Sequence, residues 1–468
     1  MKKLNCLVLP FAVAALLTFL CSVSAQDENV IGPVVKKLTR SKNFDIPPDA
    51  DANAAKYIKE GDDLLERRRE HPKEVKELTE SALKVLKKAL SKAPKVAVLR
   101  YFLCVAYQGI EKDDLALKDI EEGLKLNPEF YELLVEKADI MARKEKNDDA
   151  LKLYDEAIEK APTYTIAYLS KAGLMMKQKK FKEALELFKK VRSMEHEEDT
   201  ENGLKGLLPI LENEVRGPWG DRQSFKAEGD NYIITTDDSQ SYADRILKCA
   251  EAVYKAYTKV FPKQSSSKKE DKFPIMIFSR AEDYYRYGGP MGSGGLFNPW
   301  LGKVVFIKID KADQESNFLF HELFHQFLVK YVDDPPYWFN EGHADFFGGF
   351  YYNEKENQLE CRPNPLRVQD IQCIVQQNAQ APLSVFLQMD RSEYYSQRIG
   401  INYAQGWSFV YFLWRYQDGK YAGYAKEYFN LIKSKKRYSL KEMYQKIFAK
   451  DITTLEAEWR AFVLRGCQ

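Results

Sequence analysis

The residues of this chain best suited to chemistry are His321, Glu322 and His325, in the sequence His-Glu-Leu-Phe-His. They lie in the apolar stretch 318–329, whose aromatic and aliphatic residues favour a buried helix. Because four residues span little more than one helical turn, the two imidazoles project from the same face. There they can bind one zinc ion at about 2.0–2.1 Å each, and Glu322 can accept a proton from a zinc-bound water whose pKa the metal has lowered to about 7.

A second acidic segment follows at a distance that allows one helix to end and another to return. Glu341 lies 16 residues after His325, in the sequence Tyr-Trp-Phe-Asn-Glu-Gly-His-Ala-Asp that follows Pro335 and Pro336. The prolines mark the start of a new helix. The first motif alone is weak evidence, because many helices match it by chance. The second segment strengthens a metal-site interpretation.

Together the two segments resemble the gluzincins, the group of zinc peptidases that includes thermolysin and the large aminopeptidases. In that group the third zinc ligand is a glutamate on a following helix, often in an Asn-Glu-Gly-x-Ala-like stretch. The resemblance implies His321 and His325 as histidine ligands, Glu322 as the base and Glu341 as the third ligand. Asp345, four residues after Glu341, matches the acid that orients a histidine ligand in thermolysin-like enzymes, so we expect it to fix an imidazole tautomer.

A tyrosine on a later helix is the candidate for stabilising the oxyanion. Some gluzincins use such a hydroxyl, and the segment 402–407 (NYAQGW) resembles theirs, which selects Tyr403. A tyrosine that only packs on an apolar helix explains the pattern equally well, and Tyr394 and Tyr395 lie close by in the sequence.

The remaining interpretation of the histidines is structural. His321 and His325 would then be core histidines bonded to the backbone, but burying both with a glutamate and no partner would be costly. His343 is different, because it lies two residues from Glu341 and points to roughly the opposite side of the helix. We expect it to be structural or to face substrate, and not to bind metal.

The N-terminal half repeats with a 34-residue period. Small residues recur at one position, large apolar residues four positions later, and a proline ends each unit. The pattern resembles the tetratricopeptide repeat over about 51–197, with an insertion near 67–76 and a closing helix at 203–214. The columns are Ala82, Ala116, Ala150 and Ala184; Leu86, Ile120, Tyr154 and Phe188; and Pro94, Pro128 and Pro162.

The C-terminal half mixes strands and helices. Residues 231–236 and 273–278 are strand-like, 296–309 alternates as an edge hairpin does, and 242–261 has helical periodicity. From Glu315 onward we expect mostly helices. Such a run of strands followed by helices predicts an α+β domain. The glycine-rich segment 288–295 forms either an ordinary hairpin loop or a flap before an edge strand that can hold an extended peptide.

The predicted fold class is therefore multidomain: an all-α tetratricopeptide-type helical solenoid at 51–215, followed by an α+β zincin-like (thermolysin-like) metallopeptidase domain at 225–468. The glycine-rich hairpin, the two-histidine helix and the glutamate helix cover about 225–420. In this order they look like the peptidase-MA-like domains found behind tetratricopeptide repeats. A chain of 468 residues is long enough for two or three such domains.

The N-terminus has the features of a secretion signal. Two lysines precede an apolar run, and Val23-Ser24-Ala25 offers a cleavage point, so residues 1–25 are predicted to be removed. Residues 26–50 then form a linker, and the protein is secreted or periplasmic. We expect no stable membrane insertion, since polar residues interrupt the later apolar stretch 401–414.

Charge and cysteine content give weaker constraints. Lys+Arg (71) and Asp+Glu (69) nearly cancel, and the net charge of +2 creates no strong overall field for nucleic acid. We therefore expect no nucleic-acid partner. Five of the seven cysteines follow the signal segment, an odd number, and Cys361 and Cys373 either form a disulfide or stay reduced.

The sequence favours an exported zinc-dependent metallopeptidase that hydrolyses peptide bonds with water activated by Glu322. Its partners would be a peptide or protein substrate and a protein bound through the repeats. Two alternatives remain open: a catalytically inactive peptidase-like scaffold that binds peptides, and a zinc amidase acting on cell-wall crosslinks. The metal chemistry is common to the peptidase and the amidase.

Overall fold

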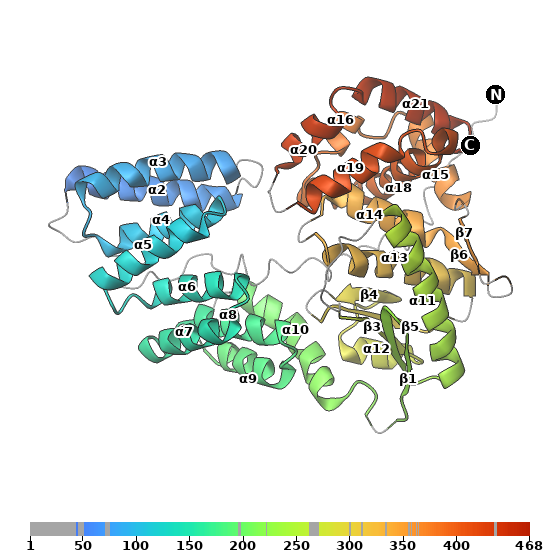
Figure 1. Ribbon diagram of the computed structural model, residues 1–468. Coiled ribbons are helices and arrows are strands. Elements are labelled where there is room, and N and C mark those ends of the chain that lie inside the picture. The colour runs from blue at the N-terminus through green and yellow to red at the C-terminus, as the bar shows by residue number, and fades with distance from the viewer. Residues whose placement is uncertain are drawn as a thin grey trace. The chain divides into compact units, whose positions relative to one another are not determined.

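The chain divides into two compact units, one spanning 27–216 and the other including 217–468 (Figure 1). The computed structural model describes residues 44, 51–70, 75–194, 198–220, 222–261, 271–298, 301–309, 312–332, 335–353, 356, 358–361, 363, 365–434 and 438–468. The predicted signal segment 1–25 lies outside these residues, as does the predicted linker 26–50 except for Phe44.

The N-terminal unit is a solenoid of antiparallel helix pairs, as the 34-residue period predicts. The alanine column and the column of large apolar residues are buried between the helices, whereas the prolines that end the repeats are exposed. Its helices are α2 (Ala52–Glu70), α3 (Val75–Lys92), α4 (Ala97–Gly109), α5 (Asp113–Leu126), α6 (Tyr131–Arg143), α7 (Asn147–Lys160), α8 (Thr165–Lys177), α9 (Phe181–Arg192) and α10 (Glu198–Arg216).

The turns inside the later repeats also obey the period. Glu111, Glu145 and Lys179 each have a positive φ, between 58° and 60°, at the turn from the first helix of a repeat to the second. Residues other than glycine rarely adopt this conformation, so its recurrence every 34 residues reflects one shared turn geometry. The first repeat departs from this pattern, because α2 and α3 have 19 and 18 residues where α4 and α5 have 13 and 14. Residues 67–70 of the predicted insertion belong to α2 and residues 75–76 to α3, while residues 71–74 lie outside the described part of the chain.

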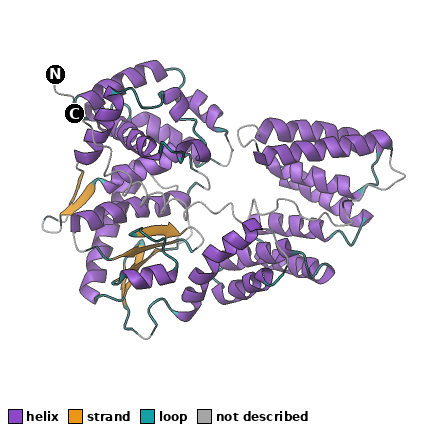
Figure 2. Ribbon diagram, turned by 180° about the vertical axis from the view of Figure 1, so that it is seen from behind, coloured by secondary structure: helices purple, strands orange, loops and turns teal. Residues whose placement is uncertain are grey.

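The C-terminal unit contains all the described strands (Figure 2). Five form a mixed sheet in the order β1-β2-β3-β5-β4, with β2, β3 and β5 parallel and both outer strands antiparallel to their neighbours. The strands are β1 (Phe225–Glu228), β2 (Tyr232–Thr236), β3 (Phe273–Phe278), β4 (Gly295–Asn298) and β5 (Lys303–Ile307). The predicted strands at 231–236 and 273–278 and the hairpin at 296–309 correspond to β2, β3 and β4–β5.

Helices of this unit cover the sheet and then pack on one another. α11 contacts β1 and β2, and α13 contacts β4 and β5. α13 also packs against α14, which in turn packs against α18, so the three form a continuous layer. The remaining elements are α11 (Gln240–Val260), α12 (Ala281–Tyr287), α13 (Ala312–Val329), α14 (Tyr337–Gly348), α15 (Pro365–Gln376), α16 (Leu383–Phe386), α17 (Arg391–Tyr394), α18 (Ile399–Arg415), η4 (Tyr416–Asp418), α19 (Ala422–Ile432), α20 (Leu440–Ile447) and α21 (Ile452–Leu464).

The chain after Glu315 is mostly helical, as expected. It also contains one hairpin that was not predicted, in which β6 (Phe350–Asn353) and β7 (Gln358–Cys361) pair in antiparallel fashion after α14. β6 is only four residues long and starts next to a helix end, so the sequence gives it no strand period of its own. One expectation needs correction: the glycine-rich segment 288–295 is not a hairpin loop, because residues 288–294 join α12 to the outer strand β4 without a regular element of their own. Gly288 and Gly292 have positive φ values of 114° and 81°.

The apolar stretch 401–414 falls within α18, which is a core helix with nearly every side chain buried. None of the described helices is long and apolar enough to span a bilayer. Cys361 and Cys373, the pair considered for a disulfide, are not joined by one in the structure.

Gly342 sets the closest approach of α14 and α18. A methyl group in its place would lie 2.8 Å from the carbonyl oxygen of Gly406 and 2.8 Å from Cγ2 of Val410. Both distances are shorter than any stable contact between a methyl group and another heavy atom, so a side chain here must push the helices apart. Glu341 stands beside this crossing and would move with it.

We expect Gly342→Ala to lower the free energy of unfolding by about 1–3 kcal/mol, the usual cost of overpacking a core. Gly423→Ala is the matched control, because Gly423 lies in α19 of the same unit with open space around its added methyl. Urea unfolding followed by tryptophan fluorescence would report this unit alone, since all six tryptophans follow residue 216. Equal unfolding midpoints for the two variants would contradict the packing argument.

Candidate metal centre

Three buried side chains from two helices meet at one point. His321 and His325 project from α13, and Glu341 projects from α14. The two Nε2 atoms are 3.1 Å apart, and each lies 3.7 Å from Oε2 of Glu341. One ligand atom from each residue lies within 4.8 Å of the others, and all three residues are buried. The structure thus brings the three predicted ligands together.

Each imidazole is oriented through its other nitrogen. Nδ1 of His321 lies 3.0 Å from Oδ1 of Asp345, and Nδ1 of His325 lies 2.8 Å from Oδ1 of Asn340. Both oxygens are acceptors, so both Nδ1 atoms carry the proton and donate. In the neutral form of each imidazole the lone pair is therefore on Nε2, facing the shared point.

This arrangement fits a zinc ion. Two Nε2 lone pairs 3.1 Å apart repel unless a proton or a cation lies between them. Oε2 of Glu341 is also buried and has no hydrogen-bond partner among the described residues. Ligand atoms about 2.0–2.1 Å from a tetrahedral metal are about 3.3 Å apart, close to the separations found here. Two imidazoles and a carboxylate form a ligand set known from catalytic zinc sites.

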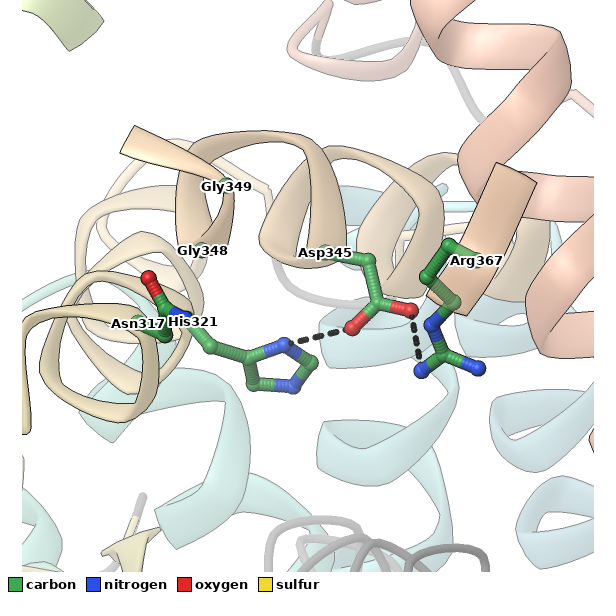
Figure 3. A pocket seen from close by; sticks show the side chains of 6 residues that line it. All are labelled: Asn317, His321, Asp345, Gly348, Gly349 and Arg367. Carbon is green, nitrogen blue, oxygen red and sulfur yellow. Dashed lines mark hydrogen bonds and ion pairs between the residues drawn. The ribbon is translucent and has the colours of Figure 1, made fainter. Parts of the chain in front are cut away.

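A small pocket opens on the Asp345 side of His321 (Figure 3). Asp345 lies between His321 and Arg367, whose guanidinium donates to Oδ2 at 2.8 Å. Burial alone raises the pKa of Asp345, but the charge of Arg367 and the hydrogen bond from His321 outweigh it and hold that pKa below its usual value. The carboxylate therefore stays charged and able to hold the imidazole. The pocket is lined by Asn317, His321, Asp345, Gly348, Gly349 and Arg367.

The same carboxylates act on the charge of His321. Burial lowers the pKa of a histidine, but here the hydrogen bond to Asp345 and the negative charges of Asp345, Glu322 and Glu341 more than offset it and raise the pKa to about 9. In the metal-free protein this histidine is therefore protonated at neutral pH. A metal ion must displace that proton in order to bind.

Glu322 lies on the side of the centre that faces the sheet. It is 2% exposed, and its Oε2 accepts a hydrogen bond of 2.7 Å from the backbone N–H of Phe297 in β4. β4 is the last strand in the sheet order, so the carboxylate is held at a sheet edge. This contact restricts the rotamer of Glu322 without using its second oxygen.

Tyrosines cover the Glu341 side. The hydroxyl of Tyr395 donates to Oε1 of Glu341 at 2.8 Å. The hydroxyl of Tyr403 is buried and has no hydrogen-bond partner in the described part of the chain. Burial, and then the charge of Glu341, raise the pKa of Tyr403 well above its ordinary value, so the hydroxyl keeps its proton. Tyr394 packs against both rings, with its ring centroid 5.4 Å from that of Tyr395 and 5.8 Å from that of Tyr403.

His343 does not join the centre. It is fully buried, its Nδ1 lies 2.8 Å from the carbonyl oxygen of Phe339, and its Nε2 accepts from the indole N–H of Trp414 at 3.0 Å. Burial lowers its pKa to about 3. Both nitrogens are therefore satisfied in a neutral ring, and of the two predicted roles the structural one applies.

Three contributors to the site were not predicted from the sequence: Asn340, Arg367 and Tyr395. Asn340 directly precedes Glu341 in the motif, so its position was a usable signal. Arg367 lies 22 residues beyond Asp345, and Tyr395 lies 54 residues beyond Glu341. No local pattern links residues at such distances, and only the packing of α15 and α17 near α14 brings them into contact.

Comparisons with known proteins bear on the N-terminal unit. Two tetratricopeptide-repeat family models match residues 106–165 and 141–201. The chain contains tetratricopeptide repeats. A solved structure described as "Functional Characterization of Pseudomonas Aeruginosa pilF" aligns with 36% of this chain and 70% of that chain, at 20% identity and a TM-score of 0.30, values too low to support any argument. No curated protein matches the chain.

The proton on His321 gives a test of the site. At pH 7, below its pKa of about 9, zinc binding should release this proton, and the release should fall as the pH rises through 9. Asp345→Asn removes the main group that holds the proton, so this variant should release fewer protons at pH 7 and bind zinc about 10–100-fold more weakly. Calorimetric titration in buffers of different ionisation enthalpy measures both. Equal proton release by the two proteins would contradict the assigned contact.

Proposed function

We propose that this protein is an exported zinc-dependent metallopeptidase of the gluzincin type. The observation that carries the proposal is the convergence of two oriented Nε2 atoms and an unpartnered buried carboxylate oxygen, with a second carboxylate, Glu322, beside them. The resemblance of both motif segments to gluzincins supports the same conclusion. His321, His325 and Glu341 would bind the metal, and the α+β unit that carries them would be the peptidase domain.

The roles of the residues follow from their contacts. A zinc ion bound there would polarise a carbonyl group and lower the pKa of water. Glu322 would accept the proton of the attacking water and pass it to the leaving amine, since one of its oxygens is fixed by Phe297 and the other is available for proton transfer. Asp345 and Asn340 would hold the two imidazoles in register throughout.

The edge of the sheet offers a place for the substrate. β4 ends the sheet on one side among the described strands, and its Phe297 N–H already contacts the proposed base. An extended peptide can add to such an edge by main-chain hydrogen bonds. A substrate aligned in this way would bring its scissile carbonyl near Glu322 because the strand and the carboxylate are in direct contact.

The tetratricopeptide repeats point to protein–protein interaction, since such solenoids bind partners along extended surfaces. In the proposed protein they would hold a protein partner or deliver a protein substrate. The signal-like segment 1–25 supports export to a periplasm or to the outside of the cell.

The proposal predicts about one zinc per chain for residues 26–468 and loss of that zinc in His325→Ala, both measured by elemental analysis. Glu322→Gln should keep the zinc, because the residue is not a ligand, and should lose nearly all hydrolysis of fluorescein-labelled casein. Full activity in Glu322→Gln would rule out its role as base.

The alternatives give distinct outcomes in the same assays. Bound zinc with no hydrolysis of casein or of a mixed peptide library, but release of fragments from crosslinked cell-wall peptides, would identify an amidase. Absence of zinc from the folded protein, even after zinc is added, would favour the inactive scaffold and leave the repeats as the functional part.

Two tyrosines near Glu341 are expected to have different roles: Tyr403 would stabilise the oxyanion, and Tyr395 would orient the ligand Glu341. Tyr403→Phe should keep zinc and lower kcat by about 10²–10³-fold, the usual cost of losing an oxyanion donor. Tyr395→Phe removes the hydrogen bond to Glu341, so it should weaken zinc binding by about 10–100-fold and change kcat little at saturating zinc. Measuring zinc affinity and kcat for both variants tests the assignment. The opposite pattern would give the oxyanion role to Tyr395.

A further inference from the structure

A phenylalanine from outside the repeats is inserted among repeat aromatics. The Phe44 ring lies 4.9 Å from Tyr101, 6.0 Å from Phe102 and 5.7 Å from Phe130, measured between ring centroids, and all three contacts are edge-on. Tyr101 and Phe130 stack on each other at 5.8 Å. We call Tyr101, Phe102 and Phe130 the aromatic pocket.

The pocket is built by two successive repeats. Tyr101 and Phe102 lie on α4, and Phe130 directly precedes α6. Phe130 is fully buried and Phe102 is 6% exposed, so both belong to the solenoid core, whereas Tyr101 and Phe44 are only partly buried. The aromatic pocket therefore combines two buried core rings, Phe102 and Phe130, with one ring, Tyr101, that is partly accessible to solvent.

The pocket does not recur along the solenoid. One and two repeat periods after Tyr101, the equivalent positions hold Val135 and Leu169. Among these three repeats, an aromatic side chain stands at this position in one only. Val135 and Leu169 are 3% and 6% exposed, whereas Tyr101 is only partly buried and its ring contacts Phe44 as well as Phe130.

We propose that the aromatic pocket is a docking site for an aromatic side chain from a peptide segment, and that Phe44 of the same chain is its resident occupant. Edge-on contacts of this kind are the favoured geometry between aromatic rings. Phe44 precedes the first residue of α2, Ala52, by only eight positions, so it competes for the pocket at the high effective concentration of a short tether. Phe44 is thus more than part of a passive linker, and a partner must displace its side chain.

The test uses a fluorescent peptide of residues 38–50 and the chain from residue 26 onward. Phe44→Ala in the protein vacates the pocket, so the peptide should bind this variant at least about tenfold more tightly than wild type, in which nine of ten pockets or more are occupied. Fluorescence anisotropy measures both affinities. The same peptide with Phe44→Ala should not bind.

Matched variants on α4 show whether binding uses the pocket. In the Phe44→Ala background, Tyr101→Ala should abolish peptide binding, and Tyr107→Ala should preserve it. Tyr107 is a partly buried tyrosine on the same helix, and its ring lies against Lys87. Circular dichroism verifies that each variant is folded. If Phe44→Ala does not fold, Phe44→Leu removes the aromatic ring while keeping an apolar side chain.

Three results would overturn the proposal: equal peptide affinity for wild type and the Phe44 variant, no binding to a folded Phe44 variant, or equal losses from Tyr101→Ala and Tyr107→Ala. None of these measurements depends on zinc or on hydrolysis. The docking site and the proposed peptidase activity can therefore succeed or fail separately.

Discussion

The C-terminal unit depends on the burial of two imidazoles and a carboxylate against one another. Nε2 of His321 and Nε2 of His325 face each other, and the nearest oxygen of Glu341 has no hydrogen-bond donor among the described residues. Buried polar groups without partners are strongly destabilising, so such a cluster persists only where a cation, or a proton in its place, completes it. The helices and strands around the three side chains hold them at these short distances.

The helix layer supplies this restraint at two levels. α14 and α18 approach closely at Gly342, so the backbone next to Glu341 cannot shift without opening the core. Around the ligands, four polar contacts fix the side chains: those of Asn340 on α14 itself, Arg367 through Asp345, Tyr395 and the backbone of β4. His343, which is also buried on α14, is neutral and has a hydrogen-bond partner for each ring nitrogen. It therefore adds no charge next to the metal centre.

The N-terminal unit follows a different constraint. Its core is periodic, because each repeat buries alanines and large apolar residues against the next, and this regularity makes any departure meaningful. Phe44 is such a departure, since it fills a pocket that the period does not produce. Under the proposed function, the solenoid would bind a protein partner and the C-terminal unit would hydrolyse a protein substrate, two roles that fit together in a single chain.

The sequence by itself determined the parts that depend on neighbours along the chain. The 34-residue columns predict the solenoid because each repeat packs on the next, and the spacing of His321 and His325 predicts a shared helix face because four residues make one turn. Glu341 and Asp345 came from resemblance to a known motif, and the structure places both beside the histidines.

Tertiary structure alone decided the contacts that join distant segments. Arg367 on Asp345, Tyr395 on Glu341, Phe297 on Glu322 and Phe44 on Tyr101 each link residues with no common period. The β6–β7 hairpin was likewise missed, since four-residue strands carry too little alternation to be recognised. Such contacts arise from how whole elements pack, and packing energies depend on three-dimensional proximity, which local sequence patterns do not encode.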